Sequence, residues 1–313
     1  WNGYLKETDV INTFNGDFGY RPDRFFLSSV VNIGDEPAQW LTNAPDTRYA
    51  LATDYGVASL MSFPNNGVSL GKMKLTYTED DGKITSETVD NVYNKGGMGA
   101  YISNSDWNIL HFGCYPANIY NWSSTFKALV DNKTLASYTV QGQTSAGVNI
   151  TYPFTVKILC PNQKGYEPIR LTWLNQWGTW DYYTFNMKSS KSISTKGSTY
   201  QQLGGTWNES TYKPNSYKGG KKSFRVNATE KIIMNTDFVN ESESEWFEEL
   251  INSPEIYILN GFKTDSPGSA LTTYVIPVRL QTSSYTRKTV ANDKLMQYTF
   301  EVEKSKTLRT QAV

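Results

Sequence analysis

The residues best suited to nucleophilic or metal chemistry are one histidine and two cysteines, His111, Cys114 and Cys160, in a chain of 313 residues. A zinc site needs about four Cys or His ligands, or three and a water molecule. These three residues stand at unfavourable spacing for such a site. His111 lies in a strand-like run, ILHFGCY, where a structural histidine is favoured over a general base or a metal ligand. We therefore expect no metal and no cofactor.

The two cysteines leave two interpretations open. They could form a disulfide in an oxidising compartment. Two buried free thiols are the favoured interpretation, because a free cysteine behaves as a small hydrophobic residue.

Motifs for other reaction classes are weak. The glycine-rich run at 96–99 lacks the Lys-Ser/Thr that would follow in a phosphate-binding loop. The acidic run at 79–82 lacks the spaced ligands of a calcium loop, so a hairpin turn is the better interpretation. A glycosidase needs two carboxylates in one cleft, which 30 acidic residues leave open. The sequence favours a protein that is not an enzyme.

Charge is unevenly distributed, although 30 basic residues balance 30 acidic ones. The segment from Tyr182 to Arg225 contains eight basic residues and one acidic residue, so its net charge is +7. The segment from Asn235 to Asn260 contains seven acidic residues and no basic residue, so its net charge is −7. Two solvated faces of one domain would account for this. Alternatively, the two segments meet between subunits, head to tail, and close a ring. The interface candidates are Lys213, Lys218, Lys221, Lys222 and Arg225, and Glu241, Glu245, Glu248 and Glu249.

Aromatic residues suggest a second kind of contact. Trp177, Trp207 and Tyr212 are candidate ligand-contacting aromatics, since basic segments rich in aromatic residues can stack on sugars or nucleobases. A chain without net charge provides little electrostatic attraction for nucleic acid, so no nucleic-acid partner is expected. No run of about 18 apolar residues exists, so no membrane span is expected.

These residues must be positioned by β-structure, and the clearest element is a hairpin at 166–190. Two runs, 169–174 and 180–187, alternate apolar and polar residues around a turn that contains Gly178. The alternation predicts a buried face, formed by Ile169, Leu171, Trp173, Tyr183 and Phe185, and leaves Trp177 at the turn as the residue most free to meet a partner.

The length predicts two domains, and the pattern before the hairpin is mainly β. Residues 1–23 are predicted to be an extended arm, and residues 24–160 an immunoglobulin- or fibronectin-III-like β-sandwich of about seven short strands. An Asp-Gly turn at 79–82 predicts a hairpin in which Leu75 and Tyr77 face Ile84.

The second domain is predicted to span 166–313 and to be β-rich. The boundary is placed at 160–165, where a strand ends in Pro, Gly and polar residues. A long basic excursion, about 188–223, is expected to be partly ordered. One amphipathic helix is predicted at about 240–252, with Asn240 as its N-cap and an acidic first turn.

An ordered series of short runs carries a family resemblance over about residues 166–305. The runs are EPIRLTWLNQWGTWDYYTFNMKS, GTWNES, GGKK, KIIMNTD, EWFEELINSPEIY, IPVR and DKLMQYTFEVE. The series resembles virion structural proteins, tail or baseplate components, of tailed bacteriophages of marine type. No single run is specific, and the order carries the resemblance.

The resemblance implies a non-enzymatic structural component of a phage tail, at the tail tip, distal tail or baseplate. Such a protein would self-assemble into a homo-oligomeric ring and contact neighbouring virion tail proteins. It would be located in the virion after assembly in the host cytoplasm. The alternative is a carbohydrate- or receptor-binding β-sandwich module for host attachment, whose partner would be a host surface glycan.

Overall fold

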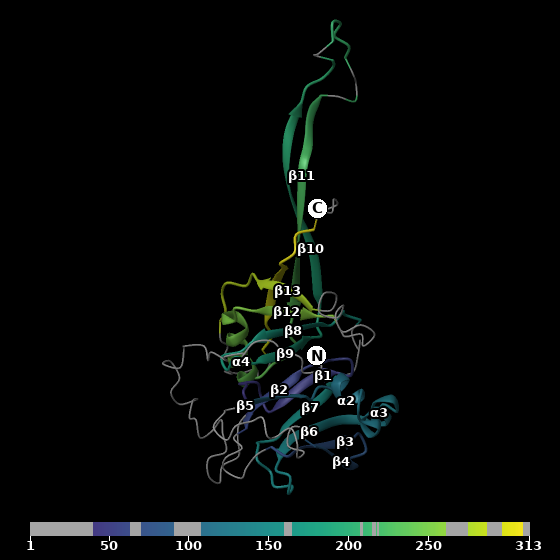
Figure 1. Ribbon diagram of the computed structural model, residues 1–313, viewed down its shortest axis with the longest axis vertical. Helices are drawn as coiled ribbons and strands as arrows, with labels where there is room; N and C mark the ends of the chain where they lie inside the picture. The colour runs from purple at the N-terminus through teal and green to yellow at the C-terminus, as the bar shows by residue number, and fades with distance from the viewer. Residues whose placement is uncertain are drawn as a thin grey trace.

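The computed structural model describes residues 40–62, 70–90, 108–159, 165–206, 209–214, 217, 219–260, 275–286 and 296–308. The fold is mainly β, as the sequence predicts, with sandwich-like sheets and short helices. Figure 1 shows a body that contains both large sheets, and a long two-stranded ribbon that extends away from it. The predicted arm at 1–23 lies outside the described residues.

The first sheet has five strands in the order β1-β7-β6-β3-β4. β1 and β7 run parallel, and the other neighbours are antiparallel. Alternate residues of β3 and β6 are buried, as expected for strands with one face on a core. The strands are β1 (Thr47–Leu51), β7 (Phe154–Leu159), β6 (Leu135–Gln143), β3 (Lys72–Glu79) and β4 (Ile84–Asp90).

A two-stranded sheet and two short helices complete this part of the molecule. The sheet pairs β2 (Val57–Ser62) with β5 (Asn108–Gly113), and the helices are α2 (Pro116–Tyr120) and α3 (Ser124–Asp131). The Ser123 hydroxyl caps α3 by accepting a hydrogen bond from the Phe126 amide at 3.0 Å. The Phe126 ring then packs edge-on against Tyr138 of β6, so α3 contributes to the same core.

The second sheet has seven strands in the order β10-β11-β14-β13-β12-β8-β9. All its neighbouring strands are antiparallel. The predicted hairpin at 166–190 is confirmed as β8 and β9, joined by a turn in which Gly178 has a φ of 71°. The strands are β8 (Ile169–Leu174), β9 (Trp180–Phe185), β10 (Ser189–Gln202), β11 (Gly220–Asn235), β12 (Ile256–Leu259), β13 (Val275–Leu280) and β14 (Thr299–Lys304).

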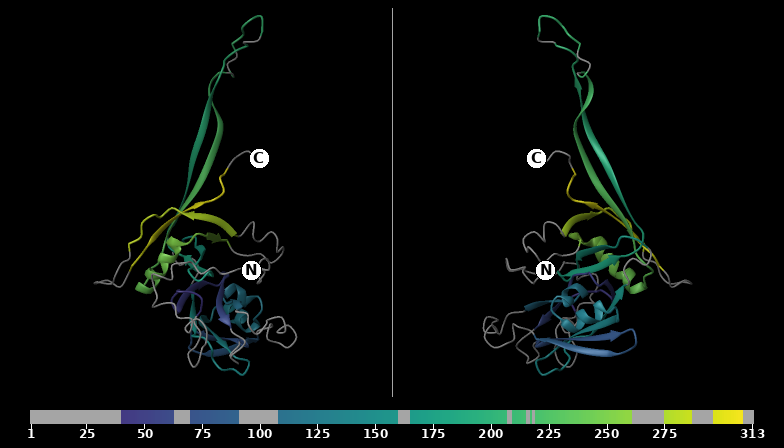
Figure 2. Two further views of the ribbon diagram at one scale, coloured as in Figure 1. Left: turned by 60° about the vertical axis from the view of Figure 1, so that its left-hand side comes forward. Right: turned by 90° about the vertical axis from the view of Figure 1, so that its right-hand side faces the viewer.

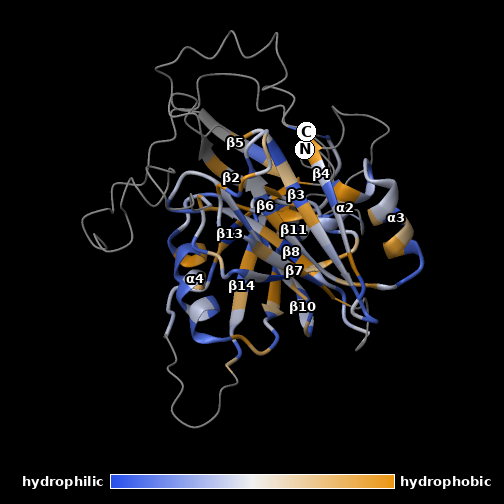
Figure 3. Ribbon diagram, turned by 90° about the horizontal axis from the view of Figure 1, so that it is seen from below, coloured by the Kyte–Doolittle hydropathy of each residue, from blue (hydrophilic) through white to orange (hydrophobic). Residues whose placement is uncertain are grey.

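Helix α4 (Glu241–Asn252) packs against this sheet and confirms the predicted helix. The Asn240 side chain accepts a hydrogen bond from the Glu243 amide, and the Glu243 carboxylate accepts one from the Asn240 amide, which completes a capping box. Phe247 is buried, and its ring lies 4.9 Å from Tyr183 and 5.4 Å from Phe300. Figure 3 shows α4 at the periphery of the molecule, largely hydrophilic in colour.

The hairpin predicted at the Asp-Gly turn is confirmed, but the predicted facing of its side chains is wrong. Ile84 pairs with Thr78 and is 67% exposed, whereas Leu75 and Tyr77 are fully buried. A shift of one residue in register moves a side chain to the opposite face of a sheet. Ile84 therefore points away from the core that Leu75 and Tyr77 enter.

Four elements were not expected from the sequence: β1, α2, α3 and β10. α2 and α3 are five and eight residues long, too short for a helical period to stand out. The predicted excursion at about 188–223 contains strand β10 and the start of β11, which the sequence analysis does not predict. Ser, Lys and Thr alternate there without a continuous apolar face, so the usual strand signal is weak.

The buried residues form two clusters, one drawn from residues 40–156 and one from residues 169–302. Cys114 is a fully buried free thiol, as expected, and burial raises its pKa to about 12. Cys160 and most of the expected boundary at 160–165 lie outside the described residues, so the division into two domains stays a prediction.

Candidate functional site

The most distinctive surface of the molecule is the ribbon formed by β10 and β11. Fourteen residues of β10 pair with β11, from Ser189 with Met234 to Gln202 with Gly220. β14 pairs with β11 from Lys231 to Asn235, and Leu308 forms one further antiparallel bridge with Ala228. Beyond Ala228, β10 and β11 are the only described strands that continue. At about 3.3 Å for each residue, β10 spans roughly 45 Å. Figures 1 and 2 show the ribbon standing clear of the body in three orientations.

The two faces of the ribbon differ in chemistry. Residues that pair directly across strands share a face, and alternate pairs share the same face. One set of pairs continues the face of Ile232 and Met234, which are buried in the second cluster. We call it the apolar face; its outer part consists of Ile193, Thr195, Gly197, Val226 and Ala228, together with Glu230, which pairs with Ile193. The opposite, hydroxyl face consists of Ser192, Ser194, Lys196, Ser198, Arg225, Asn227 and Thr229.

The apolar face is exposed to solvent along the ribbon. Ile193 is 64% exposed and Val226 46% exposed, although both belong to the residue types that proteins most often bury. An added Cβ at Gly197 would lie 3.7 Å from the Val226 side chain, which places Val226 beside this glycine. The ribbon thus exposes apolar side chains near Gly197, a residue that has no side chain of its own.

Towards its tip the ribbon contains a bulge with an exposed aromatic residue. The register shifts between Ser198 and Thr199, which leaves Phe224 without a partner in the pairing. Phe224 is 77% exposed, and its ring lies 6.5 Å from that of Tyr200. Beyond the bulge, Tyr212 is 54% exposed and packs over Gly205, where an added Cβ would meet its ring. The candidate Trp207 lies outside the described residues.

The basic interface candidates lie towards the tip of the ribbon. Lys213 lies in the tip, and Lys221, Lys222 and Arg225 lie at the beginning of β11. The Lys222 ammonium donates to the Tyr217 carbonyl at 2.9 Å, and the Arg225 guanidinium donates to the Asn227 side chain at 3.0 Å. Lys218 lies outside the described residues.

The acidic interface candidates lie on α4, beside the body. Glu249 accepts a hydrogen bond from Asn43, which joins the helix to the segment before β1. The other candidates, Glu241, Glu245 and Glu248, lie on the same helix. Figure 1 places α4 at the side of the body, well away from the outer ribbon, so one chain does not bring the two charged segments together.

The prediction that Trp177 is free to meet a partner is wrong. Its side chain is only 3% exposed, and its indole N–H donates to the Asn43 side chain at 3.3 Å. The turn around it is held to the segment before β1, because the Asn175 amide and the Thr179 hydroxyl both donate to the Leu41 carbonyl. A residue remote in sequence, Asn43, therefore covers a turn that looks exposed in the hairpin alone.

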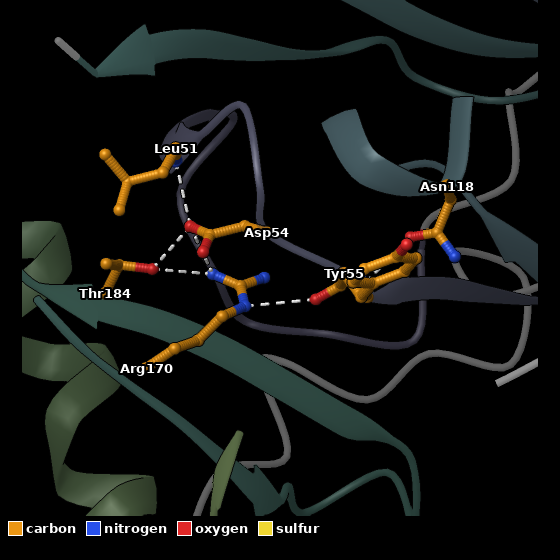
Figure 4. A network of polar contacts seen from close by, with 7 residues as sticks. Leu51, Asp54, Tyr55, Asn118, Arg170 and Thr184 are labelled. Atoms are coloured by element: carbon orange, nitrogen blue, oxygen red, sulfur yellow. Dashed lines mark hydrogen bonds and ion pairs between the residues drawn. The ribbon is translucent and has the colours of Figure 1, made fainter. Parts of the chain in front are cut away.

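A buried ion pair joins β8 to the first part of the chain. Arg170 donates to the Asp54 carboxylate at 3.2 Å, and the Thr184 hydroxyl donates to the same carboxylate at 2.7 Å. The Arg170 Nε–H also donates to the Tyr55 carbonyl at 3.0 Å, as Figure 4 shows. Both partners of the pair are more than 90% buried. Sequence reasoning missed this contact, because Arg170 and Asp54 stand 116 residues apart.

Aromatic rings enclose this guanidinium. Arg170 lies 4.6 Å from the centroid of the Tyr115 ring and 5.2 Å from that of Tyr182, within the range of cation–π attraction. Tyr115 approaches the backbone so closely that a Cβ at Gly56 would lie 2.6 Å from its ring. Only glycine leaves room for the ring at this position, so Gly56 belongs to the contact.

A second buried carboxylate, Asp181 of β9, lies in the same junction. It accepts hydrogen bonds from the Thr42 hydroxyl at 2.6 Å and from the Trp246 indole at 2.7 Å. Burial raises the pKa of Asp181 above its ordinary value. Asp181 thus links the segment before β1, the second sheet and α4.

His111 forms a cross-strand contact with Ser59 that resembles part of a catalytic dyad. The two residues pair directly between β2 and β5, and the Ser59 hydroxyl lies 2.7 Å from Nδ1 of the ring. Burial lowers the pKa of His111. Among the described residues no carboxylate orients the ring, and Ser59 is 5% exposed, so the contact is explained as a structural pair.

The described residues contain neither a metal-binding cluster nor a membrane-spanning helix. No three His, Cys, Asp or Glu side chains there lie close enough together to hold a metal ion. No helix in the described ranges is long and apolar enough to cross a membrane.

Comparisons with known proteins returned nothing: no protein-family model matches the chain, and no curated protein and no solved structure matches it.

Proposed function

We propose that this protein is a structural subunit of a larger assembly and acts without catalysis, and that the assembly is a bacteriophage tail. Within the tail, the tip, distal tail or baseplate is the proposed position. The identification of the assembly rests on the ordered series of runs over about residues 166–305. The proposal that the chain assembles at all rests on the ribbon.

The observation that carries the proposal is the ribbon's exposure. A two-stranded hairpin alone in water is marginally stable at best, and long open strand edges are surfaces that natural proteins usually cover. Here the outer parts of β10 and β11 extend beyond the rest of the sheet and expose Ile193, Phe224 and Val226. These features are those of an element that becomes covered when subunits join.

Charge supplies a second argument. The outer ribbon is basic, and α4, on the body of the same chain, is acidic. Because the two do not meet within one chain, they can attract each other between chains, as complementary surfaces do. The ribbon tip would then reach the body of a neighbouring subunit, and a head-to-tail contact of this kind closes a ring when the rotation allows.

Fewer observations support the alternative, a carbohydrate- or receptor-binding module. Trp177 is buried against Asn43 and is not available to a glycan. Tyr212 is exposed and keeps the alternative open at the tip of the ribbon, where a structural tail protein could also touch a host surface.

The test is the solution mass of the intact chain, measured by light scattering at low ionic strength over a range of protein concentrations. We expect a homo-oligomer. Reversing charge at Lys221 and Lys222, both to Glu, is expected to weaken assembly at least several-fold. A matched control reverses Lys83 and Lys127, two exposed lysines of the first core region, and is expected to leave assembly unchanged.

A monomer at every concentration would contradict the proposal that the chain assembles with itself. Assembly that is equally strong in the Lys221 and Lys222 variant would contradict the role of opposite charges and leave self-assembly standing.

A further inference from the structure

Two parts of the molecule meet through polar contacts. We call the described residues up to 159 the first part and those from 165 onwards the second part; β1 to β7 lie in the first and β8 to β14 in the second. The buried hydrophobic residues divide in the same way, into two clusters that share no residue. We call the contact between the two parts the seam. Six of its buried residues are polar: Asp54, Arg170, Asn175, Thr179, Asp181 and Thr184.

A short segment before β1, residues 40–43, bonds to both sides of the seam. The Leu41 amide donates to the Ser59 carbonyl, in the first part, at 2.8 Å. The Leu41 carbonyl instead accepts hydrogen bonds from two side chains of the β8–β9 turn, in the second part. The side chains of Thr42 and Asn43 also bond to the second part. The segment is therefore anchored in the first part and reaches the second through hydrogen bonds.

The buried ion pair forms the other half of the seam. Arg170 of the second part bonds to the Asp54 carboxylate and to the Tyr55 carbonyl of the first, as Figure 4 shows. Among the described residues, the apolar side chains that pack onto the cluster of the other part are those of Ala44 and Tyr182. Hydrogen bonds and an ion pair, rather than a shared hydrophobic core, hold the two parts together.

A polar seam opens at a lower cost than a hydrophobic core divides. Water replaces each hydrogen bond of the seam when the parts separate, so each bond contributes little to the net free energy of closing. Separation also returns Arg170 and Asp54 to water together, so neither charge is left buried without its partner. Interfaces between parts of one chain permit relative motion unless they are large and hydrophobic. Opening the seam is therefore expected to need less free energy than unfolding either cluster.

We infer that the seam is a joint, which opens while both parts of the molecule stay folded. Opening breaks the bonds that Thr42, Asn43 and Arg170 make across the seam and leaves the two clusters of buried residues intact. It uncovers the β8–β9 turn, including Trp177 and Thr179, which are buried in the closed form. The joint is a property of the single chain and does not depend on the proposed assembly.

The first experiment compares how fast a maleimide labels a cysteine at the seam and in each cluster of the intact chain. Three single-cysteine chains are used, all with Cys160→Ser. One keeps Cys114 in the first cluster; the other two have Cys114→Ala and carry Thr179→Cys at the seam or Val302→Cys in the second cluster. Each labelling rate is divided by the rate for the same chain unfolded in urea.

The Thr179→Cys chain is expected to be labelled roughly tenfold faster than the other two, because opening of the joint exposes this position without unfolding. Equal rates at the three positions would show that the seam opens only when the whole chain unfolds, and would overturn the joint.

The second experiment compares two substitutions that each remove one buried hydrogen bond. Thr42→Val removes the bond across the seam to Asp181 and is expected to speed labelling of the Thr179→Cys chain roughly fivefold, with no change at Cys114. Thr151→Val is the matched control, because the Thr151 hydroxyl accepts from the Gly142 amide within the first part at 2.8 Å.

The control substitution is expected to speed labelling of Cys114 and to leave the rate at position 179 unchanged. If Thr42→Val speeds labelling equally at both positions, or at neither, the seam is not a separate joint and the inference fails.

Discussion

The β8–β9 hairpin and the β10–β11 ribbon are consecutive antiparallel hairpins of one sheet, but their surroundings differ completely. Five of the six residues of β8 are buried, because α4 covers one face and the first part of the chain covers the other. In β10, Ser190 to Gln201 are all exposed. The two elements have the same local geometry, so strand pairing alone does not determine burial.

The difference in burial indicates a different role for each hairpin. β8 and β9 join the two clusters of buried residues through Arg170, Asn175 and Asp181, and they fix the first part of the chain against the second sheet. The ribbon contacts neither cluster along its outer half and keeps apolar side chains in solvent. One hairpin completes the subunit, and we propose that the other joins subunits.

The largest effect is expected from breaking the buried ion pair on β8. Arg170→Met keeps the length of the side chain but leaves the Asp54 carboxylate buried without its cation. Loss of one partner of a buried pair costs about 3–5 kcal/mol of unfolding free energy. Urea titration followed by tryptophan fluorescence measures this change.

The ribbon supplies the control for that substitution. Lys191→Met breaks the exposed pair between Lys191 of β10 and Glu167, and exposed pairs contribute about 0–1 kcal/mol. Similar losses of unfolding free energy in Arg170→Met and Lys191→Met would contradict the proposed difference in burial between the two hairpins.

An aromatic residue from each hairpin provides the next comparison. Trp177→Ala, at the β8–β9 turn, is expected to lower the unfolding free energy by about 3 kcal/mol, because it empties a buried site and removes the bond to Asn43. Phe224→Ala, in the ribbon, is expected to change it by less than about 0.5 kcal/mol. Thermal unfolding of dilute, dissociated protein measures both. A small loss for Trp177→Ala would show that the turn is exposed in solution.

The smallest effect is expected in the pH dependence of stability. Burial raises the pKa of Asp181 in the folded state above 3.8, its ordinary value. Between those two pKa values the folded state binds more protons than the unfolded state, so the unfolding free energy falls as the pH rises through that range. Asp181→Asn should remove this contribution, because an amide does not titrate.

The measurement for Asp181 is a set of urea titrations from pH 4 upwards on the parent and the Asp181→Asn variant. The parent is expected to lose stability relative to the variant as the pH rises, until Asp181 has titrated in the folded state. A constant difference across the range would show that the carboxylate does not titrate there.

Much of the fold follows from local sequence signals. The β8–β9 hairpin, helix α4 with its capping box, and the hairpin at the Asp-Gly turn are each specified by residues close together in the chain. The ribbon was missed, because β10 buries almost none of its residues and so lacks the alternation that burial imposes. The β-branched residues Ile193, Thr195 and Thr199 at every second or fourth position were the available signal.

The candidate site was predictable in part. The sequence located the basic segment and the acidic helix, because charge can be counted without a structure. It placed Trp177 on the surface, because nothing near it in the chain indicates that Asn43 and Leu41 cover the turn. The division of the ribbon into an apolar and a hydroxyl face needed the register of β10 on β11.

The sequence by itself determined the mainly β character, the paired strands on either side of short turns, and helix α4 with its cap. These depend on backbone preferences and hydrogen bonds between residues near in the chain. Only the tertiary structure decided which hairpin is buried and which extends into solvent. That decision depends on contacts such as Arg170 with Asp54, between residues more than 100 positions apart, and local preferences carry no information about such contacts.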